Sequence, residues 1–399
     1  MVVALVSPGI AATSDEYRVP VAVFAGEPRG PFQTGTFEEL WIDRDREETT
    51  TSDPSDLRHL MVQIWYPAQF KGDPPRAPYA LHREFYPHDE EAQWLDAAAA
   101  VRTHSVLNAP TAKHPKPFPV LIYNPGASHP PFSATFQTEY LASHGYVVVA
   151  IGHTGWTRIE RFADGYNYRP DEDDVDAAAT QTPGKSQAEQ LQHKVELYAR
   201  LKMPMLVKDI SFVLDRLQTL NSTSGHRFHD RLDLTRVGSL GWSLGGALSI
   251  QASRDEQRVK AAINLDGWLY TDVQKTGTNR PVMIMHGEGT AEESLRQSAA
   301  EREKRLFAAT LPWQLYAKMT APWYDVTLAG ADHEHFSDRT LFRSADVSAM
   351  HPRVAHDIVN RFSLEFFDKY LKGSTNTPLL SGTEQYRDVL LQQSERIKE

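Results

Sequence analysis

The chain has 399 residues, a formal net charge of −10 and no cysteine. An acidic chain repels phosphate backbones, so nucleic-acid binding is not expected. The absence of cysteine excludes disulfides, thiolate metal sites and cysteine nucleophiles. No apolar run reaches the roughly 18 residues of a membrane-spanning helix, so no integral membrane segment is expected. Length leaves open two or three domains of about 150 residues, or one large α/β unit.

Residues 1–12 (MVVALVSPGIAA) are apolar and end in small residues. This pattern is typical of the back half of a secretory signal, although its basic start is missing because the first basic residue is Arg18. We expect a truncated or weak signal here and a secreted or periplasmic protein. The alternative is a cytoplasmic protein whose chain begins with a strand or an irregular segment.

The first predicted strand, at residues 61–66 (MVQIWY), ends before Pro67, and a short helix is predicted near residues 90–101. From residue 119 onward, short apolar runs alternate with amphipathic stretches. The apolar runs predict strands at residues 120–123, 146–151, 235–240, 261–265, 281–286 and 323–328. The amphipathic stretches predict helices at residues 133–144, 186–201, 206–217, 244–254, 291–311 and 354–372, with Pro204 separating the second from the third.

Strands that alternate with helices indicate an α/β fold with a mostly parallel central sheet and helices on both faces. In such sheets the reactive groups lie in loops beyond the carboxyl ends of the strands. Residues 154–184 interrupt the alternation and contain the acidic run DEDD at residues 171–174. A charge run of this kind is typical of a solvated excursion over the surface.

The sequence GWSLGG at residues 241–246 follows an apolar strand and precedes a helix. It fits the G-x-S-x-G nucleophile elbow, in which a tight strand-to-helix turn points a serine hydroxyl out of the sheet. Small residues flank the serine because Cβ atoms at those positions would collide with the neighbouring strands. We therefore predict Ser243 as a nucleophile, with an ordinary glycine-rich turn as the alternative.

A serine hydroxyl needs a base, and the base should follow the last strand of the series. His333 and His335 both lie there, and we favour His333 because it falls in a turn of small residues. A carboxylate should orient the base. Asp266 and Glu288 each follow a strand and both satisfy the chain order serine, acid, histidine. From the residues alone Asp266 is only slightly favoured.

An oxyanion hole needs two backbone amides. One is predicted at Leu244, directly after the nucleophile, where the following helix also points its N-terminal amides. The other is predicted at Ala127, in the sequence NPGA after the strand at residues 120–123, because Pro125 has no N–H. Gly126 would shape that turn. The alternative is that the Pro-Gly pair only reverses the chain.

In combination, these motifs resemble those of the α/β-hydrolase superfamily and, more narrowly, the platelet-activating factor acetylhydrolase family of the plasma type, isoform II. The likeness runs over residues 61–373. MVQIWYPA resembles the family's early strand, NPGA stands where its His-Gly oxyanion loop stands, and LASHGYVVVAIGHT is similar to a further strand and its flanks. GWSLGG stands where the family usually has GHSFGG, LDGW matches its Leu-Asp-x-Trp, and HEHFSD matches its His-x-x-Phe-x-Asp.

The resemblance implies an α/β-hydrolase fold, Asp266 rather than Glu288 as the acid, and His333 as the base. It also implies a serine carboxylic ester hydrolase with an acyl-enzyme intermediate, acting on short-chain esters or on oxidised or short-acyl phospholipids. Two departures, Asn-Pro for His-Gly in the oxyanion loop and Trp242 for histidine, leave a polyester, aromatic diester or dienelactone-type hydrolase as the alternative. A non-catalytic binding protein of the same fold is the alternative of another class; it would lack a triad member, and none is missing.

Aromatic residues flank the three triad positions and are predicted either to line a substrate site or to pack beneath the loops. These are Trp242, Trp268 and Phe336, with Phe132 and Trp156 as weaker candidates. His153 ends a strand and is expected to be a bystander in a polar loop, with a place in the lining of the pocket as the alternative.

No metal is expected, because no further ligands stand at metal-binding spacing from His333 and His335. No cofactor is expected either, because the sequence contains no phosphate or dinucleotide loop. The expected partner is a small-molecule ester or lipid.

The three triad candidates can meet only if the series of strands and helices forms one sheet. This argues for a single domain at residues 56–375, after an N-terminal extension at residues 1–55 and before a tail at residues 376–399. The excursion at residues 154–201 accounts for part of the extra length.

Overall fold

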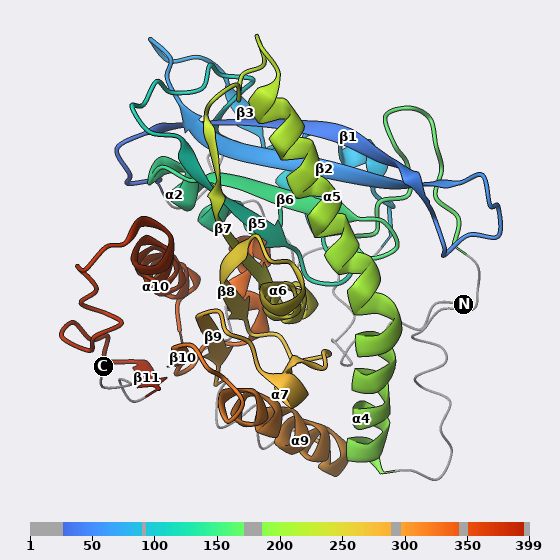
Figure 1. Ribbon diagram of the computed structural model, residues 1–399, viewed down its shortest axis with the longest axis vertical. Helices are drawn as coiled ribbons and strands as arrows, with labels where there is room; N and C mark the ends of the chain where they lie inside the picture. Colours follow the sequence, from blue (N-terminus) through green and yellow to red (C-terminus); the bar gives the residue numbers. More distant parts are fainter. Residues whose placement is uncertain (1–26, 90–92, 171–185, 289–296, 343–349, 395–399) are drawn as a thin grey trace.

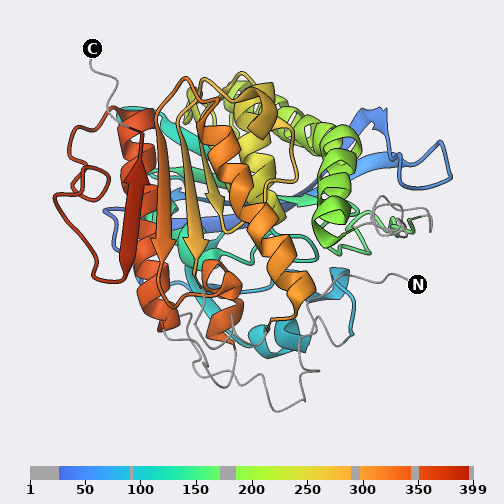
Figure 2. The same cartoon turned by 90° about the horizontal axis from the view of Figure 1, so that it is seen from below.

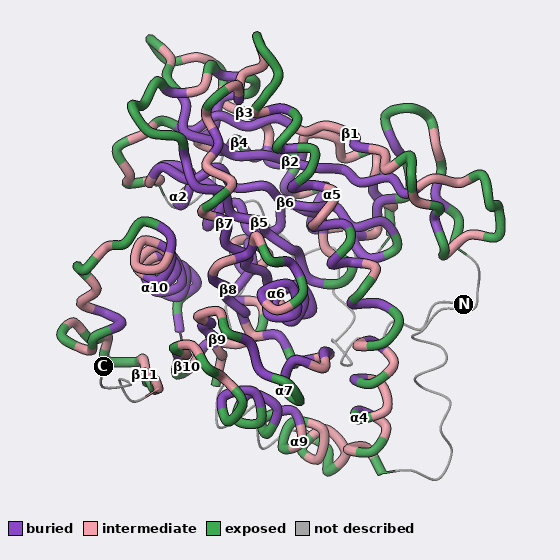
Figure 3. Tube along the Cα trace, viewed as in Figure 1, coloured by how far each residue is buried: buried purple, intermediate pink, exposed green. Residues whose placement is uncertain are grey.

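The computed structural model describes residues 27–89, 93–170, 186–288, 297–342 and 350–394. The predicted signal at residues 1–12 and the acidic run at residues 171–174 lie outside these ranges. A sheet of 11 strands crosses the molecule in the order β11-β10-β9-β8-β7-β5-β6-β2-β1-β4-β3 (Figure 1). Figure 3 shows burial concentrated on the central strands, while the outer loops are exposed.

The strands are β1 (Gln33–Glu47), β2 (Leu57–Ala68), β3 (Arg76–Pro78), β4 (Arg102–Leu107), β5 (Phe118–Asn124), β6 (Val147–His153), β7 (Leu232–Trp242), β8 (Val259–Leu265), β9 (Val282–Gly287), β10 (Trp323–Leu328) and β11 (Val389–Gln393). The α-helices are α1 (Gln93–Ala98), α2 (Thr135–Ser143), α4 (Gln187–Leu197), α5 (Met203–Ser222), α6 (Leu244–Asp255), α7 (Val273–Thr276), α9 (Ala299–Tyr316) and α10 (Pro352–Lys372). Shorter turns are η1 (Arg83–Phe85), η3 (Tyr198–Lys202), η4 (His333–Phe336) and η5 (Asp338–Leu341).

Six neighbouring strands, β6, β5, β7, β8, β9 and β10, run parallel to one another. Every residue of β5 and β6 is buried, because helices cover both faces of the sheet. Along β5, Leu121 and Tyr123 pack in one cluster with α2 and α10, whereas Val120 and Ile122 pack in another with α5 and α6. The structure thus has the predicted fold class, a mostly parallel sheet between two layers of helices. Within the described ranges, no helix is long and apolar enough to cross a membrane.

The six strands predicted from residue 120 onward are confirmed as β5 to β10. The earlier strand, predicted at residues 61–66, is the centre of β2. Its expected end before Pro67 was wrong, because β2 continues to Ala68. Pairing between β2 and β6 stops at Trp65. Beyond it the same edge of β2 pairs with residues 110–112, where the carbonyl of Pro67 accepts from the N–H of Ala112 at 2.8 Å.

The expected break near Pro204 is absent. Helices α4 and α5 are joined by the π-helical turn η3, and together they form one long rod along the sheet (Figure 1). Pro204 lies in the first turn of α5. A wider turn before it accommodates the missing N–H and the proline ring without ending the helix.

Four strands of the described ranges were not predicted. Strands β3 and β4 lie within residues 56–375, whereas β1 and β11 lie outside that range. Strand β1 pairs antiparallel with β2 over most of its length, from Gln33 opposite Ala68 to Asp43 opposite Arg58. Strand β11 pairs antiparallel with β10 and forms one edge of the sheet, where Figure 2 shows it running against its neighbours. The sheet therefore continues beyond the range predicted for the domain, whose boundaries remain a prediction.

Candidate active site

Ser243 stands between β7 and α6 in a conformation that residues with a Cβ rarely adopt, with φ 55° and ψ −127°. Such a backbone costs about 1–3 kcal/mol and persists only where the surroundings fix it. Its N–H donates to the carbonyl of Leu265 at 2.8 Å. A Cβ on Gly245 would lie 2.0 Å from the carbonyl oxygen of Asn124, so only glycine fits there. The turn has the geometry expected of a nucleophile elbow.

The structure brings Ser243, His333 and Asp266 together, although they come from three different loops. Nε2 of His333 lies 3.1 Å from Oγ of Ser243, and Nδ1 lies 2.6 Å from Oδ2 of Asp266. The three side chains therefore form a continuous hydrogen-bonded line from hydroxyl to carboxylate. The imidazole is 44% exposed, so the line is open to a ligand from solvent.

Asp266 is held in place by β9. Its N–H donates to the carbonyl of Met285 at 2.8 Å, and its Oδ1 accepts from the N–H of Gly287 at 3.0 Å. These bonds leave Oδ2 free to face His333. The rival Glu288 is exposed, and no hydrogen bond within the described ranges joins its carboxylate to His333.

His333 begins the 3₁₀ turn η4, and Trp242 fixes its position. The indole Nε1 donates to the His333 carbonyl at 3.0 Å, and the two rings lie 4.9 Å apart. The rival His335 is fully buried and points elsewhere, with Nδ1 2.8 Å from Asp332 and Nε2 2.9 Å from the carbonyl of Met350. Only His333 reaches the serine.

The pKa of His333 reflects two opposing effects. The surrounding protein atoms disfavour the charged imidazolium and lower the pKa. The hydrogen bond and negative charge of Asp266, with the charges of Glu334 and Asp332, outweigh this effect and leave the pKa above its usual value. The ring is thus a stronger base than a free histidine.

The amides of Leu244 and Ala127 belong to two segments that meet at Ser243. Leu244 is the first residue of α6, and Ala127 is exposed in the loop after β5. This loop passes directly over the elbow, because a Cβ on Gly126 would lie 2.7 Å from the Trp242 ring and 3.3 Å from Cβ of Ser243. Neither amide donates a hydrogen bond to an acceptor within the described ranges. Both N–H groups are therefore available to a ligand.

A sequence model of the family described as platelet-activating factor acetylhydrolase, isoform II, matches residues 49–378. The chain belongs to this family. It is 24% identical over 349 residues to platelet-activating factor acetylhydrolase of Cavia porcellus, an alignment that covers 78% of this chain and 72% of the relative. It is 26% identical over 292 residues to a probable 1-alkyl-2-acetylglycerophosphocholine esterase of Arthroderma benhamiae, covering 69% of this chain and 66%, just under two thirds, of the relative.

Among solved structures, a ferulic acid esterase from Streptomyces cinnamoneus is similar, with a TM-score of 0.65 and 25% sequence identity. The match covers 92% of this chain and 98% of that one. The acetylhydrolase-family chain therefore has an α/β-hydrolase fold. The relatives support carboxylic ester hydrolysis as its class of reaction.

The three aromatic residues predicted beside the triad differ in exposure in this acetylhydrolase-family chain. Trp268 is 37% exposed, whereas Trp242 is 1% exposed and Phe336 is fully buried. Trp242 packs against His333 and supports it from within. Trp268 is therefore the member that we keep as a proposed substrate contact. The weaker candidates, Phe132 and Trp156, are also buried.

Sequence reasoning missed His129, which lies two residues after the NPGA segment of this acetylhydrolase-family chain. Its ring lies 4.5 Å from Trp242 in an edge-to-face contact, and its Nδ1 lies 2.9 Å from the carbonyl of Ala127. Burial lowers the pKa of His129 to about 4, so the ring is neutral at pH 7. The histidine two residues after NPGA was the only available signal.

Within the described ranges, no group of three or more histidine and carboxylate side chains is arranged to hold a metal ion.

Proposed function

We propose that this chain is a serine carboxylic ester hydrolase that works through an acyl-enzyme intermediate, with Ser243 as nucleophile, His333 as base and Asp266 as orienting acid. The observation that carries the proposal is the hydrogen-bonded line from Oγ of Ser243 through the imidazole to Oδ2 of Asp266. A serine hydroxyl is a weak nucleophile by itself, and an oriented imidazole activates it. Family membership supports the ester as the bond that is cleaved.

In the proposed reaction, Oγ of Ser243 forms a bond to the ester carbonyl carbon as Nε2 of His333 takes the hydroxyl proton. The tetrahedral intermediate then releases the alcohol, which receives that proton from His333. A water molecule gives a proton to Nε2 and attacks the acyl carbon, and Ser243 leaves with the proton as the acid is released. Asp266 stabilises the imidazolium in both halves of the reaction.

The amides of Ala127 and Leu244 are the proposed oxyanion hole. Leu244 starts α6, so the helix dipole adds to its N–H. Removing one donor of such a hole typically costs about 10²–10³-fold in kcat. Asp266, Glu334 and Asp332 raise the pKa of the base, whereas the backbone amides supply partial positive charge to the oxyanion.

As substrates we propose short-chain esters or phospholipids with a short or oxidised acyl chain. The names of the relatives, acetylhydrolase and alkyl-acetylglycerophosphocholine esterase, support this class. A second candidate is an ester of an aromatic acid. It is favoured by the ferulic acid esterase structure and by the exposed Trp268, two residues after the proposed acid, where an aromatic acyl group would stack.

Kinetics on purified wild type and Ser243→Ala test the proposal. The substrates are p-nitrophenyl acetate, a short-acyl phosphatidylcholine and methyl ferulate, and the covalent probe is a fluorophosphonate. We expect Ser243→Ala to lose ester hydrolysis by about 10⁴-fold or more and to lose labelling completely. The matched control is Ser253→Ala on α6, whose hydroxyl bonds the Ile250 carbonyl and the Thr278 hydroxyl and takes no part in the proposed reaction. Failure of the wild type to label or to hydrolyse any ester would support a non-catalytic binding protein instead.

A further inference from the structure

Residues 124–128, the last residue of β5 and the loop after it, carry the proposed oxyanion amide of Ala127 and rest on a buried polar network. We propose that His153, held by Asp209 and Arg58, is a positioning residue that fixes this loop against the nucleophile elbow. The inference rests on the proposed function, because it assigns the network a role in the same reaction. It differs from the sequence expectation, in which His153 was a bystander in a polar loop.

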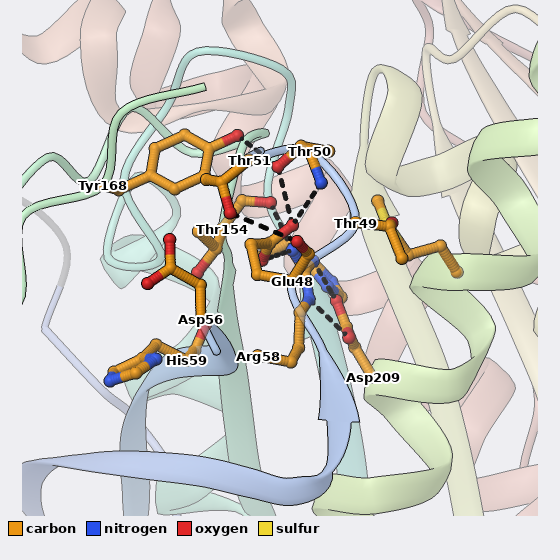
Figure 4. Close-up of polar contacts among 12 residues, drawn as sticks. Glu48, Thr49, Thr50, Thr51, Asp56, Arg58, His59, Thr154, Tyr168 and Asp209 are labelled. Atoms are coloured by element: carbon orange, nitrogen blue, oxygen red, sulfur yellow. Dashed lines mark hydrogen bonds and ion pairs between the residues drawn. The ribbon is translucent and has the colours of Figure 1, made fainter. Parts of the chain in front are cut away.

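The network begins with a cluster of buried charges. Arg58 of β2 is 1% exposed and lies between Glu48 and Asp209, as Figure 4 shows. Its guanidinium donates to Glu48 at 2.7 Å and to both carboxylate oxygens of Asp209 at 3.0 and 2.6 Å. Burial raises the pKa of Asp209, but the charge and hydrogen bonds of Arg58 and the hydrogen bond of His153 have a larger effect. They hold the pKa of Asp209 well below its usual value. Asp209 is therefore a fixed negative charge inside the protein.

This cluster fixes the end of β6. Nδ1 of the fully buried His153 lies 2.8 Å from Oδ2 of Asp209. The next residue is held twice: Arg58 donates to the carbonyl of Thr154 at 2.9 Å, and the Thr154 hydroxyl donates to the carbonyl of His59. Residues 153–154 therefore have little freedom to move.

The end of β6 in turn holds the loop of residues 124–128 at three points. Nε2 of His153 lies 3.1 Å from Oδ1 of Asn124. The indole N–H of Trp156 donates to the carbonyl of Pro125 at 3.2 Å, and the N–H of Ser128 donates to the Trp156 carbonyl at 2.8 Å. Ala127 lies between these contacts, so its amide position depends on them.

Asn124 connects the same network to the nucleophile elbow. Its amide nitrogen donates to the hydroxyls of Ser239 on β7 and Ser249 on α6, at 3.1 and 2.9 Å. It also stands opposite Gly241 in the pairing of β5 with β7. One side chain therefore contacts His153, the strand before Ser243 and the helix after it. A shift of Asn124 would change the distance between the two oxyanion amides.

A purely stabilising role explains this network poorly. Burying charged groups costs several kcal/mol of desolvation for each ion, which the pairing only partly offsets. Replacing a buried ion pair by well-packed apolar side chains is often neutral or stabilising. A fixed hydrogen bond, in contrast, specifies the position of a backbone segment. A misplacement of about 1 Å at a reacting centre can cost about 10²-fold in rate.

The test compares an oxoester with its thionoester, in which sulfur replaces the carbonyl oxygen. Backbone amides hydrogen-bond weakly to sulfur, so a perturbed oxyanion hole slows the oxoester more than the thionoester. We expect His153→Phe to lower the oxoester-to-thionoester ratio of kcat by about 10- to 100-fold. His153→Gln keeps a polar group near the position of Nε2 and should restore part of the ratio. KM for the oxoester should change far less than kcat.

Glu256→Gln is the matched control for Asp209→Asn. Both variants remove a carboxylate charge paired with an arginine, but Glu256 pairs with Arg258 beyond the C-terminal end of α6. Asp209→Asn should lower the ratio, whereas Glu256→Gln should leave it unchanged. Asp266→Asn should slow both substrates equally, because it acts on the base and not on the oxyanion.

Circular dichroism first establishes that each variant is folded. If His153→Phe does not fold, Trp156→Phe decides, because it removes the N–H bond to Pro125 while keeping an aromatic ring, and it should lower the ratio. An unchanged ratio in folded variants, with an active wild type, overturns the positioning role and leaves the proposed function intact. A wild type that neither labels nor hydrolyses esters overturns the proposed function and this inference with it.

Discussion

Asp266 shows how one side chain is aimed by its backbone. Its φ of 54° lies in the left-handed region, which costs a residue with a Cβ about 1 kcal/mol or more. This conformation allows its N–H to donate to the carbonyl of Met285 and its Oδ1 to accept from the N–H of Gly287, both on the neighbouring strand. Both anchors come from β9. The carboxylate therefore has one oxygen fixed to the sheet and the other directed at His333.

Asp266→Asn should lower kcat by about 10⁴-fold, because an amide at this position no longer stabilises the imidazolium or fixes its tautomer. The matched control is Glu288→Gln, which removes a carboxylate from the loop after the next strand and should leave kcat nearly unchanged. Both are measured with one p-nitrophenyl ester at saturating concentration. A larger loss in Glu288→Gln than in Asp266→Asn would contradict the assignment of the acid.

The pH dependence follows from the raised pKa of His333. The imidazole must be neutral to take the serine proton, so activity is lost as pH falls through that pKa. We expect kcat/KM of the wild type to rise with pH through an apparent pKa above about 6.5, the ordinary value for histidine, and then to level off. In Asp266→Asn, the residual activity should show this rise at lower pH, because the main raising influence is gone. If the midpoint of the pH profile were the same in Asp266→Asn as in the wild type, Asp266 would not be the group that raises the pKa of His333.

At the scale of elements, Asp338 joins the loop of the proposed base to α2, the helix after the proposed oxyanion loop. The residue before α2 is an alanine and provides no side-chain cap. Asp338, from η5, accepts instead from the N–H groups of Thr135 and Phe136 at 2.5 and 3.1 Å and from the Tyr79 hydroxyl at 2.9 Å. Its own N–H donates to the carbonyl of Ser133 at 2.8 Å. The final residue of the HEHFSD motif thus caps a distant helix.

Asp338→Ala should lower the free energy of unfolding by about 2–4 kcal/mol, because it removes a helix cap and leaves buried donors without an acceptor. Asp338→Asn keeps one acceptor oxygen and should cost less. Urea unfolding monitored by tryptophan fluorescence measures both. Because α2 follows the oxyanion loop, kcat should also fall in the folded alanine variant. Equal midpoints for wild type and Asp338→Ala would show that the cap contributes nothing.

The central strands could be predicted because both of their faces are buried, so each appears in the sequence as a short apolar run. Strand β1 could not be predicted in this way. Much of its second half is charged and partly exposed, and its strand conformation comes from pairing with β2. The continuity of α4 and α5 was also hidden, because a π turn before Pro204 is not visible in an apolar pattern. Local patterns predict elements that bury their own side chains, and they miss elements that depend on a partner.

The same distinction applies to the candidate site. Ser243 was predictable because the glycines around it are required by the turn itself. The buried network around His153 was not predictable, because its contacts join residues that are far apart in the sequence. His153 lies 56 residues from Asp209 and 29 residues from Asn124. A lone histidine at a strand end has no sequence feature that separates a bystander from a buried partner. From the residues alone Asp266 was only slightly favoured over Glu288, because the sequence pattern does not contain the contacts of Asp266 with β9 and His333.

At the scale of the whole molecule, the net charge of −10 surrounds a site that has its own acidic groups. Asp332 and Glu334 flank His333 in η4 and its cap, and Glu288 lies exposed after β9. Arg339 lies 3.5 Å from Glu334 and offsets part of this charge. The local and overall charges have the same sign, so the field at the site should oppose the approach of an anionic ester.

Varying the ionic strength separates this electrostatic repulsion of the substrate from the rate of the catalytic step. Raising salt from about 0.01 to 0.15 M shortens the screening length from about 30 to 8 Å. For an anionic ester such as mono-p-nitrophenyl succinate, kcat/KM should rise on the order of 10-fold over this range. For neutral p-nitrophenyl butyrate, the matched control of similar chain length, it should stay constant. A decrease for the anionic ester would mean that a positive potential dominates at the site, and would direct attention to Arg339 as a group that binds anionic substrates.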